Sequence, residues 1–128
     1  SSSVNPAELK ADLQLIMGWL VRTANHDERA RQQAFAAATA QAPMDGPWHI
    51  PADTNLRDIH AVDRALAHLA ACKPAFRKAV LRACIAAVEA DGVITPREYE
   101  LLRTVAQALD CPLPLPGPGT TQAASGNA

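Results

Sequence analysis

The chain has 128 residues, with 12 basic and 13 acidic side chains and a formal net charge of −1. This length suits a single domain that buries a real core without disulfide or metal staples. The near-neutral balance argues against binding nucleic acid or an anionic membrane through bulk charge. No run of about 20 apolar residues is present, as a membrane span needs. The apolar segment from Leu13 to Val21 is too short, and no basic n-region precedes it, so we do not expect a signal peptide.

Alanine dominates the composition with 27 residues, while aromatic residues make up 4% of the chain. Alanine favours helix over sheet, and the few β-branched residues are scattered rather than clustered into strands. We therefore expect an all-α fold, a bundle of about five helices. The three cysteines, Cys72, Cys84 and Cys111, form no CxxC pair and are odd in number, which indicates a reducing compartment and free thiols.

The first two helices are predicted from their capping residues and apolar faces. The first begins at Pro6, with Asn5 as N-cap and Glu8 reaching back to the cap amide, and Asn25 ends it. Asp27 starts the second. The first helix has an apolar face at a 3.6-residue period: Leu9, Leu13, Ile16, Met17, Leu20 and Val21. The second has a narrow face for close packing: Ala30, Ala34, Phe35 and Ala38.

The longest internal loop is predicted at residues 42–53. Four residues there cannot continue a helix: Pro43, Gly46, Pro47 and Pro51. Trp48 lies among them, and we expect its ring to pin the loop onto the body of the fold.

Three further helices are predicted after the loop. The third runs from Thr54 to Cys72, with its apolar stripe at Leu56, Ile59, Val62, Leu66 and Leu69. The fourth follows Lys73 and Pro74 and is expected to be the central helix, because its stripe is the most hydrophobic: Phe76, Val80, Leu81, Cys84, Ile85 and Val88. The fifth runs from Pro96 to Leu109 and is expected to bury Leu101, Leu102, Val105 and Leu109.

The two ends of the chain are expected to lie outside the folded domain. Residues 1–4 are predicted to be a disordered leader, and the bundle is predicted over residues 5–111. Residues 112–128 begin Pro-Leu-Pro-Leu-Pro-Gly-Pro-Gly and continue with small polar residues. Such a segment lacks the apolar content to fold, so we predict a flexible Pro/Gly-rich tail.

The sharpest local signal is the run Ala-Asp-Gly-Val-Ile-Thr-Pro-Arg-Glu at residues 90–98. Gly92 is expected to supply the positive-φ position that ends the fourth helix. Thr95 is expected to cap the fifth helix, with Pro96 at its first position and Glu98 completing a capping box. A structural corner is therefore predicted from Gly92, Ile94, Thr95, Pro96 and Glu98, with Ile94 filling the gap between the helices.

The same run also resembles the second half of an EF-hand calcium loop, with Glu89, Asp91 and Glu98 at ligand positions. The first position of that loop needs an aspartate, but Ala87 stands there. Calcium takes six or more oxygens, and this corner offers about four. We therefore predict a structural corner and no metal site, with Glu89, Asp91 and Glu98 as the candidate ligands should a metal bind.

No catalytic or cofactor-binding residue is predicted from the remaining polar residues. The chain contains neither HExxH nor a glycine-rich phosphate loop. His60 and His68 lie about 12 Å apart along the third helix, so they are predicted to be surface histidines. The neighbouring charged residues are predicted to form ordinary surface pairs: Arg57, Asp58, Asp63 and Arg64. Cys84 is predicted to be a small core residue, and no oriented base is found for any cysteine.

Four pieces of the chain carry a family resemblance: Arg82-Ala83-Cys84, the run 90–98, Glu100-Leu101-Leu102-Arg103 and Ala108-Leu109-Asp110-Cys111-Pro112-Leu113-Pro114. Together they resemble the C-terminal region of HtpX-type membrane zinc metallopeptidases (metallopeptidase family 48). Residues 33–37, Gln-Ala-Phe-Ala-Ala, resemble the segment that follows the peptidase part in that family. The run 90–98 is shared more widely with tellurite-resistance TerB-like helical domains.

The resemblance implies a non-catalytic interaction or regulatory domain of a larger, membrane-anchored zinc metalloprotease. The zinc ligands and catalytic glutamate of that family lie in an upstream HExxH helix, and no residue of this chain matches them. The resemblance places the domain on the cytoplasmic side of a bacterial inner membrane. Its expected partner is the peptidase domain or another protein, with no nucleic acid. The alternative is a TerB-like module that binds a divalent metal through Asp91, Glu98 and a neighbouring carboxylate.

Overall fold

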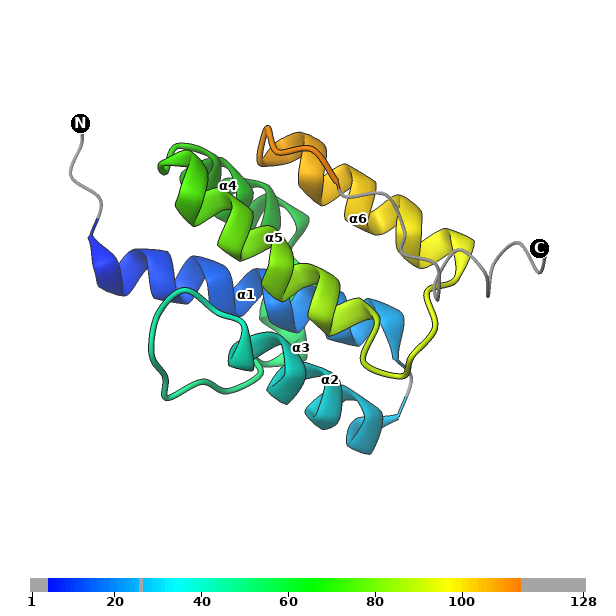
Figure 1. Ribbon diagram of the computed structural model, residues 1–128. Helices are drawn as coiled ribbons and strands as arrows, with labels where there is room; N and C mark the ends of the chain where they lie inside the picture. The colour runs from blue at the N-terminus through cyan, green and yellow to red at the C-terminus, as the bar shows by residue number, and fades with distance from the viewer. Residues whose placement is uncertain (1–4, 26, 114–128) are drawn as a thin grey trace.

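The computed structural model describes residues 5–25 and 27–113, and this part of the chain contains helices and no strand. The all-α class predicted from composition is confirmed. The helices of this part are α1 (Pro6–Ala24), α2 (Glu28–Ala40), α3 (Asp53–Leu56), α4 (Ile59–Ala70), α5 (Pro74–Val88) and α6 (Pro96–Ala108) (Figure 1). The predicted leader and the tail from residue 114 onward lie outside the described residues.

The first two helices begin at their capping residues. The Asn5 side-chain oxygen accepts a hydrogen bond from the Ala7 amide, at 2.9 Å. The return bond predicted from Glu8 to the cap amide is not among the hydrogen bonds of the described residues. Asp27 Oδ1 accepts from the amides of the second and third residues of α2, as an N-cap should.

The prediction of one continuous third helix is wrong, because the structure has two helices there, separated by Arg57 and Asp58. Asp58 is in an extended conformation, and its Oδ1 accepts from the amides of His60 and Ala61, so it caps α4 instead of continuing α3. One consequence is that Ile59, placed on the predicted apolar stripe, is 54% exposed. The bundle therefore has one helix more than expected in its described part.

Two long helices form the centre of the bundle. α1 and α5 pack against each other, and α2 and α4 each pack against both (Figure 1). α6 packs against α4 and α5, while the short α3 packs against α1 and α4. The predicted central position of α5 is thus shared with α1. Within the described residues, no polar or charged residue is buried, so the core between the helices is made of apolar contacts.

α6 ends in a Schellman motif in which Asp110 takes the left-handed position usual for glycine, with φ 52°. The Asp110 amide donates to the Gln107 carbonyl, and the Cys111 amide donates to the Ala106 carbonyl. This turn directs the chain back over the bundle, where Cys111 and Leu113 pack against the core. Leu113, the second residue of the predicted tail, is therefore in contact with the domain.

Within residues 5–25 and 27–113, none of the helices combines the length and apolarity that a bilayer crossing needs.

Candidate functional site

A groove of about 350 Å³ runs between α1 and α4, and we call it the α1–α4 groove. Its polar lining comes from both helices and from the segment before α4: Asp12, Gln14, Asn55, Asp58, Arg64 and His68. Its apolar residues are fewer: Ala11, Leu15, Pro51 and Ala61. Six polar side chains from separate segments line this one groove, so we take it as the candidate site.

An aspartate and a histidine from different helices meet in the groove. Asp12 Oδ2 of α1 lies 3.0 Å from His68 Nδ1 of α4. The Asp12 side chain is 17% exposed and that of His68 is 56% exposed. Burial raises the pKa of the Asp12 carboxyl, and the hydrogen bond and charge of His68 lower it by less. The pair therefore links the two walls of the groove at a partly desolvated point.

The third wall of the groove is the loop after α2, and contacts from α1 fix its position. The His49 amide donates to Gln14 Oε1 at 2.9 Å. Lys10 Nζ lies 5.2 Å from the ring centre of Trp48, within the range of a cation–π contact. Trp48 itself is half-buried against the core, so it pins the loop as predicted.

Gly18 is buried in the middle of α1, and because it has no side chain the loop can pack closely against this helix. A Cβ atom at Gly18 would lie 2.7 Å from Pro51 Cδ and 3.3 Å from Leu56 Cδ2. Because Pro51 lines the groove, the missing side chain of Gly18 sets how closely the loop approaches α1.

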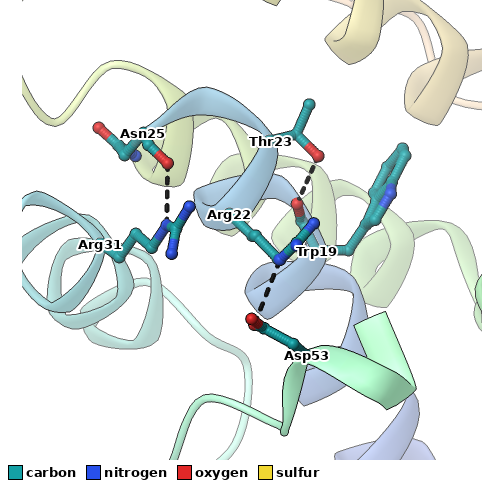
Figure 2. A network of polar contacts seen from close by, with 6 residues as sticks. All are labelled: Trp19, Arg22, Thr23, Asn25, Arg31 and Asp53. Atoms are coloured by element: carbon teal, nitrogen blue, oxygen red, sulfur yellow. Dashed lines mark hydrogen bonds and ion pairs between the residues drawn. The ribbon is translucent and has the colours of Figure 1, made fainter. Parts of the chain in front are cut away.

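A network of polar contacts fastens the C-terminal end of α1 to its neighbours (Figure 2). Arg22 Nε lies 3.2 Å from Asp53 Oδ1, which ties α1 to the start of α3. Arg31 Nε of α2 donates to the Asn25 carbonyl at 2.8 Å, where the end of α1 leaves carbonyls without helical partners. Thr23 Oγ1 donates back to the Trp19 carbonyl at 2.8 Å. These contacts hold α2 and α3, on either side of the loop, in place against α1.

The Asp12–His68 pair resembles the orienting half of a catalytic dyad, but the cysteine that follows it is poorly suited as a nucleophile. Cys72 lies one turn after His68, and its Sγ is 3.6 Å from the His68 carbonyl oxygen. Burial raises the pKa of the Cys72 thiol, and the charge of Arg77 counteracts this only in part. An activated cysteine needs a lowered pKa. Cys72 is therefore a poor candidate for a nucleophile.

The predicted corner between α5 and α6 uses its side chains to satisfy the backbone. Thr95 Oγ1 accepts from the Glu98 amide at 3.2 Å, and Glu98 Oε1 accepts from the Thr95 amide at 2.9 Å, which forms the capping box. Asp91 Oδ1 accepts from the Val93 amide at 3.1 Å. Pro96 is the first residue of α6, and the half-buried Ile94 packs against the core.

Gly92 does not end α5 directly. The helix stops at Val88, and a further turn follows in which the Gly92 amide donates to the Glu89 carbonyl at 2.9 Å. Gly92 has φ +87° and nothing within 4 Å of the place where a Cβ would stand. Its role is thus to turn the exposed chain between the helices.

The candidate metal ligands of the corner do not form a cluster. Glu89 and Asp91 are exposed, and Glu98 is half-buried with one oxygen on the Thr95 amide. Across the described residues, no group of three or more His, Cys, Asp or Glu side chains is arranged to hold a metal ion.

One prediction about surface charge needs correction. The ion pairs within the described part join Arg22 to Asp53, His68 to Asp12 and Arg103 to Glu100, so the surface pairs predicted around α4 are wrong. Asp58 is occupied by capping α4, as described above. His60 and His68 are both exposed, as predicted, but His68 also contacts Asp12 of α1. The sequence gives no local sign of this contact, because its two residues are 56 positions apart.

Comparison of the chain with models of protein families, with curated proteins and with solved structures finds no match. The resemblance to HtpX-type metallopeptidases therefore rests on the sequence motifs alone.

Proposed function

We propose that this chain is a non-catalytic helical interaction domain, and that the α1–α4 groove receives a segment of its partner. The observation that carries the proposal is that the groove is already formed and its loop wall is fastened from α1. The His49–Gln14 bond and the contact of Pro51 with Gly18 hold that wall. A binding surface that does not have to order itself on contact keeps more of its interaction energy as affinity.

The lining of the groove supports a protein segment as the ligand. Its floor offers apolar side chains such as Leu15 and Pro51, and its rim offers Asn55, Arg64 and His68 as hydrogen-bonding groups. Protein interfaces combine an apolar centre with a polar rim in this way. A volume of about 350 Å³ accommodates a few side chains of a partner.

The sequence resemblance supports a more specific proposal about the partner. In it, the chain is the C-terminal, cytoplasmic part of an HtpX-like membrane zinc metalloprotease, and the groove contacts the peptidase domain. Zinc would then belong to that peptidase domain, since no HExxH occurs in the 128 residues. The coding sequence upstream of Val4 tests this parentage. An HExxH motif and hydrophobic spans are expected there, and their absence would contradict it.

Site-specific photo-crosslinking in the parent protein tests the groove itself. A photoreactive amino acid at Arg64, on the rim, is expected to crosslink to the peptidase domain. The same group at Thr104, exposed on α6, is the matched control and is expected to give no such product. Equal yields from the two positions, or no product from Arg64, would rule out the groove as the contact surface.

Thermal unfolding with added calcium, zinc or EDTA separates this proposal from a TerB-like metal-binding module. We expect no change in the melting temperature. A metal present at 100 times its Kd adds about 2.7 kcal/mol to the free energy of unfolding. A clear metal-dependent rise that Asp91→Asn removes would favour the metal-binding module.

A further inference from the structure

A second, smaller hollow of about 160 Å³ lies between α5 and the residues that follow α6, and we call it the α5 slot. Its lining consists of Lys78, Leu81, Arg82, Ile85, Cys111 and Pro112. Leu81 is buried, while Ile85 and Cys111 are half-buried against the core. The slot therefore has an apolar floor, and it is smaller than the clefts of about 300–1,000 Å³ that bind drug-sized ligands.

The rim of the slot carries uncompensated positive charge. Lys78 and Arg82 are exposed and lie one helical turn apart on α5. Neither forms an ion pair with an acidic side chain anywhere in residues 5–25 and 27–113. Residues 1–4, 26 and 114–128 contain no Asp or Glu that could supply one. From Pro74 to Val88 the charged side chains are all basic, although the chain as a whole has a net charge of −1.

We propose that the α5 slot binds an acidic segment of a partner protein, with one apolar side chain in the slot and carboxylates on either side paired with Lys78 and Arg82. The apolar floor selects the anchor residue, and the two cations select the charge of its neighbours. The slot shares no lining residue with the α1–α4 groove. This second surface can therefore be tested independently of the proposed function.

The competing occupant is the chain's own tail, which begins next to Pro112. Its sequence from 114 to 128 offers an apolar side chain at Leu115 but no acidic residue. A tail in the slot would leave Lys78 and Arg82 without partners, so charge complementarity favours an acidic segment from another protein.

Fluorescence anisotropy with the full chain and labelled synthetic peptides tests the proposal. The probe is Glu-Glu-Leu-Glu-Glu, and the controls are Lys-Lys-Leu-Lys-Lys and Glu-Glu-Ser-Glu-Glu. We expect a Kd on the order of 100 μM for the probe, as suits a small surface. Both controls are expected to bind at least about tenfold more weakly. Equal binding of all three peptides, or no binding of the probe at 1 mM protein (about ten times that Kd), overturns the proposal.

Two double variants with the same change in net charge locate the binding surface. K78E/R82E is expected to weaken binding of the acidic probe about tenfold or more and to strengthen binding of the basic control. R57E/R97E, which reverses two exposed charges away from the slot, is expected to change the Kd less than about twofold. Equal losses in the two variants would overturn the proposal, because they would indicate bulk charge.

A third variant addresses the tail. Leu115→Ser in the full chain is expected to leave all the Kd values unchanged. If it instead strengthens binding of acidic and basic peptides alike, the slot belongs to the tail and the proposed acidic partner is wrong.

Discussion

Two connections of the bundle, the corner between α5 and α6 and the loop between α2 and α3, are stabilised in opposite ways. The corner between α5 and α6 is held by bonds among its own residues, such as the Thr95–Glu98 capping box. The loop between α2 and α3 is held from outside, by Gln14, Lys10 and the space above Gly18, all on α1. The corner is therefore a local structure, whereas the loop, and the groove wall it forms, depends on a helix about 30 residues away in the sequence.

This difference predicts which substitutions change only the stability and which also move the groove wall. A change at the corner should alter stability without moving the α1–α4 groove. A change on the loop-facing side of α1 should move the groove wall even where the loop sequence is intact. Each of the following changes tests one side of this contrast, beginning with the largest expected effect.

Gly18→Val is expected to lower the free energy of unfolding by about 3 kcal/mol, the upper end for overpacking. Its Cβ would meet Pro51 Cδ at 2.7 Å, and a proline ring cannot rotate away. Valine has a slightly better helix propensity than glycine, so any loss comes from the contact. Urea unfolding followed by circular dichroism measures the loss, and limited proteolysis should cut residues 42–52 faster. Ala7→Val, exposed in the same helix, should cost only about 0.5 kcal/mol and leave the loop protected.

Gly92→Val is expected to cost about 2 kcal/mol through backbone strain alone, because φ is +87° and no atom lies near the new Cβ. Gly92→Asn should cost less than half as much, since asparagine tolerates this conformation. Proteolysis of residues 42–52 should stay at the wild-type rate in both variants. Faster cleavage of that loop would show that the corner is not a local structure.

Asp110→Gly is expected to raise the free energy of unfolding by about 0.5–1 kcal/mol, because glycine relieves the strain of φ 52° at the end of α6. The same substitution at Gln107, exposed in the last turn of α6, should lower it by up to about 1 kcal/mol. Chemical unfolding of both variants measures whether each substitution raises or lowers the free energy of unfolding. A lower free energy of unfolding for Asp110→Gly would mean that the Asp110 side chain stabilises the fold by more than its left-handed backbone conformation destabilises it.

Asp12→Asn should have the smallest effect, below about 0.5 kcal/mol at neutral pH, the usual size for a partly exposed pair. The raised pKa of Asp12 means that the folded state holds its proton to higher pH than the unfolded state does. This carboxyl therefore disfavours folding increasingly as the pH rises from about 3.9, its unfolded value, to its raised folded value, and the penalty is constant above that. The free energy of unfolding of wild type, minus that of Asp12→Asn, should fall over this range. A rising difference would show that His68 outweighs burial.

The local parts of the fold were predictable from residue types. Asn5, Asp27 and Thr95 cap helices because their side chains reach the first free amides, and such contacts span two or three residues. The break before α4 was missed for a physical reason. Leu56 and Ile59 both fit a helical period, and this pattern masked the capping role of Asp58 between them.

The candidate site was much less predictable. Trp48 could be assigned to pin its loop, because a large ring in a loop needs somewhere to pack. The Asp12–His68 pair and the fit of Pro51 over Gly18 depend on how α1 crosses its neighbours. No period or motif encodes that crossing, so polar residues such as Asp12 and Gln14 looked like ordinary helix surface.

The buried thiol of Cys84 can report how often the core opens. Its side chain is completely buried, and burial raises the pKa of the thiol to about 12. Alkylating reagents attack thiolates, so this sulfur can be labelled at neutral pH only while the helices around it part. The rate at which a maleimide modifies Cys84 then reports those openings, and no labelling site has to be introduced for the measurement.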